Sequence, residues 1–519
     1  MVPATLTFPD DYLALSMTAW NMTLWYGCYI AVFLGLSIFG AHRLRILWLY
    51  WKHRKEVPQP KGYFAELPIV TVQLPVFNEV LVVNQLLDAV SKLDYPREKL
   101  QIQILDDSTD DTCMVCEEGA ERLRAQGFDI MYLHRDNRVG FKAGALEEAM
   151  PHTKGEFLLI FDADFVPQPD LLQKMIHHFT DEQVGLVQAR WGHINKNDSL
   201  LTRLQAMMLD GHLVLEQTAR SRSGHFFNFN GTAGIWRKRS IVEAGGWEHD
   251  TLTEDMDLSY RAQMKGWRFI YLTDVVVPAE LPPDMDGFKS QQHRWTKGSI
   301  QVAKKILGTI WRSSESFGIK IESTAHLTAN FAYLLMFGVL VLMYPATFMF
   351  KNSWQKAVFL DLPVFLFASL SVIIFYLVAQ GAQRPWGWLK ALPYLPLLLA
   401  LGIGMSINNG KAVLEALFNQ QSDFVRTPKY GQQATVRKRS RYKAVRSITF
   451  WIEVVLAAYF SWLVAMALWN GQWASVPFLA MFQFGFLYVV LGSVSKWLSW
   501  SISLPPSPPE EPTSDPAMA

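Results

Sequence analysis

The sequence has few cysteines, almost no net charge and none of the common glycine-rich phosphate-binding motifs. Its three cysteines, Cys28, Cys113 and Cys116, are too few for a disulfide framework, and the single C-x-x-C is interpreted as two ordinary helix cysteines. A net charge of +1 over 519 residues argues against a nucleic-acid-binding protein. Because neither G-x-G-x-x-G nor G-x-x-x-x-G-K-[ST] occurs, neither a dinucleotide-binding fold nor a P-loop is supported.

Charged residues are also absent from several long stretches, which indicates a membrane protein. The first stretch, Tyr12–Ala41, exceeds the roughly 20 apolar residues that a helix needs to span a bilayer. We therefore predict an extracytoplasmic N-terminus at 1–19 and a transmembrane helix at 20–42. The positive-inside rule places in the cytoplasm the basic residues that follow, which are Arg43, Arg45, Lys52, Arg54 and Lys55.

The C-terminal half contains further uncharged stretches. The dense basic loop at 421–447 belongs in the cytoplasm, and a crossing at Ala391–Gly410 would place it on the opposite side. We therefore predict that 386–420 is an interfacial or amphipathic segment. The Pro-rich tail at 496–519 is predicted to be disordered. The remaining predicted crossings are 324–350, 359–383, 448–469 and 473–495.

Between positions 60 and 285 the pattern is that of a soluble α/β domain. Short apolar runs alternate there with helix-length segments, which predicts a mostly parallel, Rossmann-like sheet. The runs expected to form buried strands are Ile69–Val76, Ile102–Leu105, Ile130–Leu133, Phe157–Phe161 and Val184–Val187.

The run at 157–161 ends in a pair of carboxylates, Asp162 and Asp164, separated by one alanine. Two carboxylates at the end of a buried strand are costly unless a positive group binds them. Mg²⁺ or Mn²⁺ carrying a diphosphate would satisfy both, because these ions prefer oxygen ligands and often bind through carboxylates plus phosphate. The alternative is an ordinary strand-to-turn pair that caps the next helix.

Polar side chains also follow the neighbouring predicted strands. Glu79 follows the first strand, and Asp106 with Asp107 follows the second. Since the carboxyl ends of parallel strands meet at one edge of a sheet, these acceptor oxygens suit the N–H and O–H donors of a nucleotide. Lys142, in the sequence G-F-K-A-G after the third strand, is placed to reach phosphate.

Two motifs precede the second membrane region. Asp255, in T-E-D, opens a helix-like segment whose N-terminal dipole favours the ionised carboxylate, so it is either a general base or a helix cap. Gln291, Arg294 and Trp295, in Q-Q-H-R-W, lie together in predicted interfacial helices at 286–320. Arg suits a leaving diphosphate and Trp suits a sugar face; the alternative is an interfacial Trp–Arg pair.

These motifs, in this order and flanked by membrane segments, resemble the processive family-two glycosyltransferases, which include cellulose, chitin and hyaluronan synthases. F-N-G-T-A-G, E-D-M-D-L and Q-Q-H-R-W are most similar to the cellulose synthase-like A and C proteins, which make mannan or glucomannan and the glucan backbone of xyloglucan. The resemblance implies an α/β GT-A (Rossmann-like) catalytic domain inserted in an α-helical multi-pass membrane domain.

The resemblance also implies a role for each motif residue. Asp255 would be the catalytic base, and Asp164 with Asp162 would hold Mg²⁺ or Mn²⁺. F-V-R-T-P-K at 424–429 is similar to the gating loop of cellulose synthases, although Arg426 replaces a valine. The alternative is a basic membrane-surface loop. Acceptor binding is expected from Trp295, Gln291 and Asn230. Donor binding is expected from Asp106, Asp107, Glu79, Lys142, Asp162, Arg294, Thr427 and Lys429.

The expected function is inverting, processive transfer of hexose from UDP-glucose or GDP-mannose to a growing β-1,4-linked glucan or mannan, with export through the bilayer. The catalytic domain would face the cytoplasm, at a bacterial inner membrane or a Golgi membrane. Two alternatives remain open. One is a non-processive enzyme that glycosylates diacylglycerol or ceramide. The other is a non-catalytic membrane scaffold or transporter, against which the intact motif residues argue.

Overall fold

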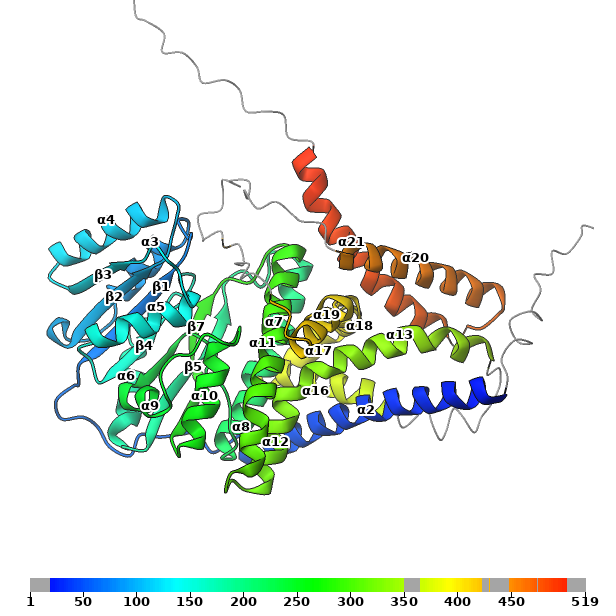
Figure 1. Cartoon of the computed structure of the whole chain (residues 1–519), viewed down its shortest axis with the longest axis horizontal. Coiled ribbons are helices and arrows are strands. Elements are labelled where there is room, and N and C mark those ends of the chain that lie inside the picture. The colour runs from blue at the N-terminus through cyan, green and yellow to red at the C-terminus, as the bar shows by residue number, and fades with distance from the viewer. Residues whose placement is uncertain (1–18, 350–364, 422–428, 430–447, 474, 502–519) are drawn as a thin grey trace, which may run out of the picture.

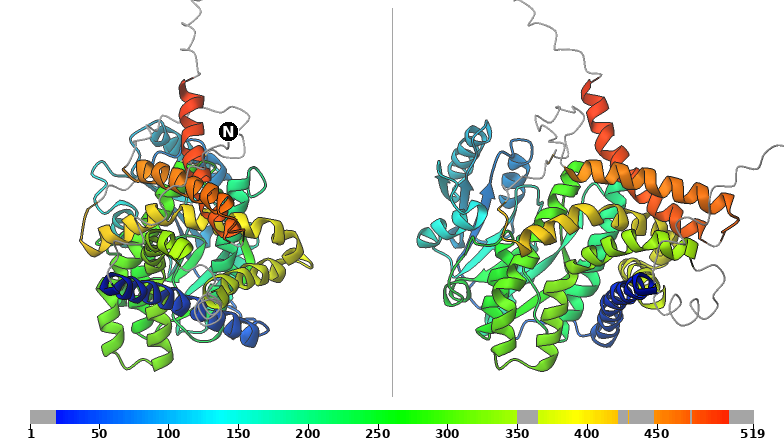
Figure 2. Two further views of the ribbon diagram at one scale, coloured as in Figure 1. Left: turned by 90° about the vertical axis from the view of Figure 1, so that its right-hand side faces the viewer. Right: turned by 45° about the vertical axis from the view of Figure 1, so that its right-hand side comes forward.

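The computed structural model describes residues 19–349, 365–421, 429, 448–473 and 475–501. A sheet with its covering helices lies at one end of the molecule, and long apolar helices lie at the other (Figures 1 and 2). Helix α11 (Met285–Arg312) runs between the two parts. The predicted N-terminus and most of the predicted basic loop lie outside the described residues.

The part that contains the sheet has seven strands in the order β3-β2-β1-β4-β6-β5-β7. Strand β6 runs antiparallel to β4 and β5, and the other pairs are parallel. This confirms the predicted α/β class, although the sequence analysis had predicted neither β6 nor β7. The strands are β1 (Val70–Val76), β2 (Leu100–Asp106), β3 (Asp129–His134), β4 (Phe157–Ile160), β5 (Val184–His193), β6 (Gly234–Arg237) and β7 (Arg268–Ala279).

Helices cover both faces of the sheet, which explains why nearly all residues of β1, β2 and β4 are buried. Leu158 and Leu159 of β4 are both fully buried and pack into the cores on opposite faces, as successive strand residues must. One core is closed by α3 (Val83–Val90) and α4 (Thr112–Ala125). The other is closed by α5 (Phe141–Ala149), α9 (Lys238–Glu243) and α10 (Glu254–Met264).

The strand register brings the chemistry-bearing loops to one edge of the sheet. Val76 at the end of β1 pairs with Asp106 at the end of β2, and Gln73 of β1 pairs with Ile160 at the end of β4. The segments that follow these three parallel strands therefore lie side by side. This edge faces α11 and the apolar helices.

Among the residues that the structure describes, five helical stretches are long and apolar enough to cross a membrane, which indicates a membrane protein. Four overlap predicted crossings. The fifth, Gly387–Gly404, falls where an interfacial segment was predicted. The described part of the predicted crossing at 359–383 begins at position 365, where a π-helical turn at Phe365–Leu370 runs into α16 (Ser371–Gln383). The other four stretches are Gly27–His53, Phe317–Leu342, Ile448–Trp469 and Val476–Val494.

The stretch at 387–404 is not one regular helix. It consists of α17 (Gly387–Ala391), a 3₁₀ turn at Leu392–Tyr394 and α18 (Leu395–Gly404). Helix α18 packs closely on α21 (Val476–Ser501): a Cβ at Gly404 would lie 2.5 Å from the carbonyl oxygen of Gly485. Small residues permit this backbone approach between apolar helices. Helix α21 also continues past position 496, where the tail was predicted to begin.

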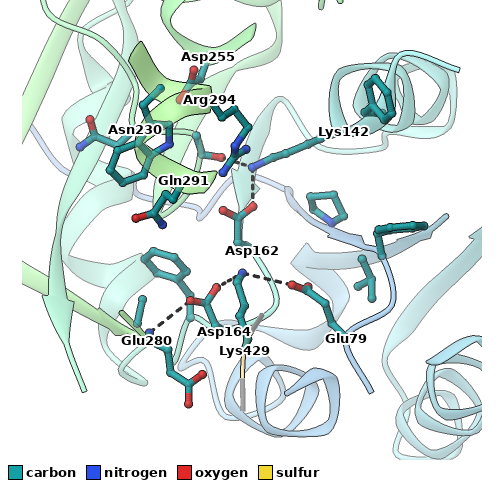
Figure 3. A pocket seen from close by; sticks show the side chains of 18 of the residues that line it. Glu79, Lys142, Asp162, Asp164, Asn230, Asp255, Glu280, Gln291, Arg294 and Lys429 are labelled. Atoms are coloured by element: carbon teal, nitrogen blue, oxygen red, sulfur yellow. Dashed lines mark hydrogen bonds and ion pairs between the residues drawn. The ribbon is translucent and has the colours of Figure 1, made fainter. Parts of the chain in front are cut away.

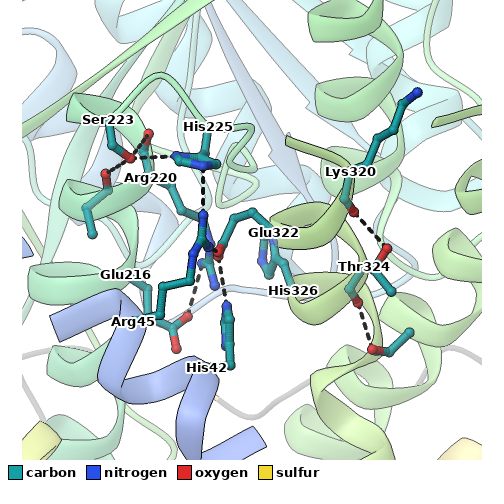
Figure 4. A network of polar contacts seen from close by, with 12 residues as sticks. His42, Arg45, Glu216, Arg220, Ser223, His225, Lys320, Glu322, Thr324 and His326 are labelled. Carbon is teal, nitrogen blue, oxygen red and sulfur yellow. Dashed lines mark hydrogen bonds and ion pairs between the residues drawn. The ribbon is translucent and has the colours of Figure 1, made fainter. Parts of the chain in front are cut away.

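A buried ionic network joins the first apolar helix to the part that contains the sheet (Figure 4). Glu322 of α12 (Phe317–Thr328) is 1% exposed at its side chain and accepts hydrogen bonds from Arg220 of α8 (Gln217–Arg222) at 3.0 Å and from Arg45 of α2 (Ala19–His53). His42 of α2 contacts the same carboxylate at 3.0 Å. One buried carboxylate therefore holds three helices together.

Candidate active site

A cleft lies at the carboxyl edge of the sheet (Figure 3). It brings together side chains from the strand ends, α5, α10 and α11. Asp106 is not among its lining residues, and Thr427 lies outside the part of the chain that the structure describes. The predicted site residues that line it are Glu79, Asp107, Lys142, Asp162, Asp164, Asn230, Asp255, Gln291, Arg294, Trp295 and Lys429.

Asp162 and Lys142 form an ion pair in the centre of the cleft. Lys142 lies in the first turn of α5, which begins after Gly140 in a left-handed conformation (φ 72°). Its Nζ donates to Asp162 Oδ1 at 2.5 Å and to the carbonyl oxygen of Gly231 at 2.7 Å. Burial acts to raise the pKa of Asp162, but Lys142 and Lys429 outweigh it and hold that pKa below its usual value. Asp162 is therefore ionised at neutral pH.

Asp164 and Glu79 both face Lys429. The Lys429 ammonium group pairs with Asp164 and lies 3.3 Å from Glu79 Oε1. The Asp164 side chain is only 5% exposed, and burial raises its pKa despite the nearby ammonium group. The backbone N–H of Glu280 also donates to Asp164, at 3.3 Å. Lys429 thus supplies, beside the buried Asp164 carboxylate, the positive charge that was expected at the Asp162–Asp164 pair.

Asp255 is the second residue of α10, and its Oδ1 accepts the backbone N–H of Met256 at 2.8 Å. The N-cap position belongs to Thr253, so Asp255 is not the helix cap. Burial, with the neighbouring Glu254, raises the pKa of Asp255 to about 7, against the opposing charges of Lys142 and Arg294. A carboxylate with a pKa near the operating pH is suited to general base catalysis.

Gln291, Arg294 and Trp295 reach the cleft from the first half of α11. Asp284 caps this helix by accepting the N–H of Gly287 at 3.0 Å. On a different part of its surface, Lys297 donates to Glu415 of α19 (Ser406–Leu417) at 3.1 Å, which fixes the helix against its neighbour. The cleft-facing residues are therefore held on a rigid element.

The loop F-N-G-T-A-G passes directly beside Asp255. Gly231 has a left-handed backbone (φ 81°), and a Cβ there would lie 3.0 Å from Asp255 Oδ2. Glycine is required at this position for both reasons. Asn230 lines the cleft, and its Oδ1 accepts from Gln217 Nε2 at 2.7 Å.

The two aspartates after β2 have separate environments. Asp107 reaches the cleft and receives a bidentate pair from Arg135, with distances of 2.7 and 2.6 Å. Asp106, the last residue of β2, is fully buried and accepts hydrogen bonds from Tyr132 at 2.9 Å and from His134 at 3.1 Å. In this structure Asp106 therefore organises the neighbouring strand end rather than facing the cleft.

The structure adds cleft residues that the sequence argument did not select. The guanidinium of Arg138 lies over the ring of Phe77, 3.3 Å from its centroid, and both line the cleft. Trp191 and His193, at the end of β5, line it as well. The sequence offered a signal only for Arg138, a cation four positions before the predicted phosphate ligand Lys142.

Comparison with known proteins identifies the family. Residues 68–298 match the family described as glycosyltransferase like family 2. Glucomannan 4-beta-mannosyltransferase 1 of Oryza sativa subsp. japonica is 37% identical over 398 residues, which are 74% of this chain and 73% of that protein. Glucomannan 4-beta-mannosyltransferase 7 of Arabidopsis thaliana is 32% identical over 84% of this chain and 78% of its own length. The chain belongs to the cellulose synthase-like glycosyltransferases.

This cellulose synthase-like protein is thus a nucleotide-sugar-dependent hexosyltransferase. Its GT-A fold is shared with a mannosyltransferase from Pyrobaculum calidifontis whose structure contains GDP-Man and Mn²⁺. That structure superposes with a TM-score of 0.52 at 20% identity, over 76% of this chain and 100% of the other. The combination of a GT-A domain with membrane helices is the architecture that the sequence motifs implied.

Proposed function

We propose that this protein is a processive, inverting β-1,4-hexosyltransferase that extends a mannan or glucomannan chain from GDP-mannose. The observation that carries the proposal is the placement of Asp255, with its raised pKa, in the same cleft as Asp162, Asp164 and Arg294. A candidate base and the groups proposed to bind the diphosphate thus line the same cleft. The names of the relatives, which are mannosyltransferases acting on glucomannan, favour mannose over glucose.

In the proposed reaction the acceptor hydroxyl oxygen attacks the anomeric carbon of the donor sugar. Asp255 accepts the hydroxyl proton as the new glycosidic bond forms. The bond from the anomeric carbon to the diphosphate breaks on the opposite face, and its electron pair leaves with the nucleoside diphosphate. Lys142 and Arg294 line the cleft and stabilise the charge that develops on that leaving group.

Asp162 and Asp164 fit a divalent cation. Both are carboxylates in a buried cleft, and Asp164 already requires a positive partner, which Lys429 supplies here. When bound, Mg²⁺ or Mn²⁺ would neutralise the donor diphosphate. Lys429 and Thr427 belong to the segment proposed to contact the bound nucleotide.

We further infer that the catalytic domain faces the cytoplasm, where nucleotide sugars are made, and that the polymer leaves through the apolar helices. The cleft meets these helices at α11, whose Trp295 would hold the acceptor end at the junction. A polysaccharide is too polar to cross lipid without such a path.

The product assay tests this proposal. Membranes containing the protein are incubated with Mn²⁺ or Mg²⁺ and either labelled GDP-mannose or labelled UDP-glucose. The expected result is ethanol-insoluble label from GDP-mannose that endo-β-1,4-mannanase releases. Label recovered only in the organic-soluble fraction would overturn the polymer proposal in favour of a glycolipid product. Insoluble label from UDP-glucose alone, released by a β-1,4-glucanase, would correct the sugar.

A further inference from the structure

A groove separate from the active-site cleft lies between the ends of α2 and α16. The two helices run side by side (Figure 1): a Cβ at Gly40 of α2 would lie 1.7 Å from the carbonyl oxygen of Phe367, in the π-helical turn before α16. The groove shares no lining residue with the cleft in the described part of the chain. Its lining includes Trp51 of α2 and the nearby Arg54, Leu377 and Val378 of α16, and Trp388 of α17.

A sharp turn after α16 brings Trp388 back to this groove. Trp386 has a left-handed backbone (φ 59°), and a Cβ at Gly387 would lie 2.2 Å from the carbonyl oxygen of Gln380. Glycine permits that backbone approach because it has no Cβ. Trp388 then lies against α16, where a Cβ at Gly381 would be 3.7 Å from its side chain. Trp388 therefore lines the groove while it remains 40% exposed.

Arg54 presents an accessible guanidinium group at the groove. The group stacks on Trp51, 3.8 Å from the ring centroid, and both residues are exposed. No carboxylate forms an ion pair with Arg54 among the residues that the structure describes. Arg222 of α8 donates to the backbone carbonyl oxygen of Arg54, which fixes the end of α2. Stacking covers one face of a guanidinium and leaves its N–H edge able to bind phosphate oxygens in a bidentate manner.

The surroundings of the groove have the composition of a membrane–water boundary. Trp48 and Trp386 are 59% and 67% exposed, and Glu56, the acidic residue after α2, pairs with His53 at 2.9 Å. Exposed tryptophans with an excess of basic residues are typical of the cytoplasmic ends of membrane helices, where basic pockets between helices bind anionic lipid headgroups. The other exposed cations at these two helix ends are Lys52, Lys55, Arg384 and Lys390.

We propose that this groove binds an anionic glycerophospholipid. Arg54 donates to the phosphate of the headgroup, and one acyl chain lies along Leu377 and Val378, where it contacts the Trp388 ring. The apolar walls favour a lipid over free phosphate, and the excess of basic residues favours an anionic headgroup over a zwitterionic one. This site lies outside the cleft and does not depend on the reaction proposed for it.

The test measures lipid binding to the purified full-length protein in detergent. The probe is phosphatidylglycerol with a fluorescent label on one acyl chain, and phosphatidylcholine with the same label is the zwitterionic comparison. Phosphatidylglycerol should bind about tenfold more tightly, because its headgroup carries a net negative charge. Arg54→Gln should weaken its binding about tenfold, whereas Arg54→Lys keeps the charge but loses the bidentate geometry and should weaken it about threefold. Trp388→Ala should weaken the binding of both lipids, since an apolar contact is lost.

Arg239→Gln is the matched control. Arg239 is also an exposed arginine near a tryptophan ring, 5.9 Å from the Trp267 centroid, but it belongs to α9 at the sheet end of the molecule. Its substitution should change the affinity by less than about twofold, because exposed charges far from the groove are screened. Without lipid, Arg54→Gln and Arg239→Gln should melt at the temperature of the wild-type protein.

Three results would overturn the proposal. The first is equal affinity for the two lipids, or wild-type affinity in Arg54→Gln. The second is complete displacement of the labelled lipid by inorganic phosphate, which would show that the groove takes free phosphate. The third is the loss of a dimer in Trp388→Ala with unchanged lipid affinity, which would show that the groove is an interface between two copies of the chain.

Discussion

The ammonium group of Lys429 pairs with the carboxylate of Asp164 across 265 positions of sequence. Asp164 follows a central strand, whereas Lys429 comes from the basic segment between two groups of apolar helices. The contact places a residue of that segment in the centre of the cleft, beside Glu79 and close to where the donor diphosphate is proposed to bind.

Lys429→Ala leaves Asp164 and Glu79 without their common cation. Removing one partner of a buried pair typically costs about 3–5 kcal/mol, so the free energy of unfolding should fall by an amount of this order without a divalent ion. Mn²⁺ should restore much of the loss by supplying the missing positive charge. Chemical denaturation with and without EDTA measures both effects.

Lys174→Ala is the control for that experiment. Its partner Asp170 is one helical turn away, and both side chains are about half exposed, so the change should be below about 1 kcal/mol and insensitive to Mn²⁺. Equal effects of the two substitutions, or no Mn²⁺ rescue of Lys429→Ala, would argue against a shared cation position at Asp164.

Sugar transfer should require a divalent cation that Asp162 and Asp164 bind. EDTA is expected to abolish transfer, and Mn²⁺ or Mg²⁺ to restore it. Asp164→Asn removes one anionic ligand, which should lower kcat/KM by about 100-fold and raise the Mn²⁺ concentration needed for half-maximal rate. Full activity of the wild-type protein in EDTA would show that these carboxylates serve another purpose.

The rate should depend on pH through Asp255. Its pKa is raised to about 7, so the carboxyl group is protonated and inactive as a base below that value and ionised above it. The prediction is that kcat/KM climbs as the pH increases through about 7 and then levels off. A rate that stays constant down to about pH 5 would mean that Asp255 titrates at its ordinary value or is not the base.

The Glu322 network should be important for stability. Glu322→Ala leaves the guanidinium groups of Arg45 and Arg220 without their carboxylate, and a loss of about 3–5 kcal/mol in unfolding free energy is expected. The exposed pair Arg239–Glu243 provides the comparison, because Glu243→Ala should cost less than about 1 kcal/mol. Similar losses for the two variants would contradict a structural role for the buried network.

Sequence reasoning located the strand-end residues of the cleft for a simple physical reason. Apolar runs marked β1, β2 and β4, and the parallel arrangement forced the residues after them to one edge, which brought Glu79, Asp107 and Asp162 together. Strand β6 escaped detection because its sequence, G-I-W-R, has only two successive apolar residues, whereas β4, of the same length, is apolar throughout. Strand β6 forms through its pairing with β4 and β5, and its own hydrophobic pattern does not predict a strand.

The sequence does not encode which way some side chains point or which distant segments pack together. Asp106 and Asp107 are adjacent, and only the fold determines that Asp107 enters the cleft while Asp106 turns toward β3. Trp191 resembled an ordinary buried aromatic residue until α11 brought Trp295 beside it. The prediction for 386–420 rested on the charge of the following loop and on the prolines and glycines within the segment. The close approach of Gly404 in α18 to Gly485 in α21 joins distant segments, and no local pattern encodes it.

Asp255→Asn tests whether Asp255 is the base of the glycosyl-transfer reaction. Sugar transfer from labelled GDP-mannose and equilibrium binding of GDP are measured on the same purified protein. Transfer is expected to fall by about 100- to 10,000-fold, while GDP binding changes by no more than about twofold. Transfer that remains within about tenfold of the wild-type rate, with binding intact, would contradict this role of Asp255.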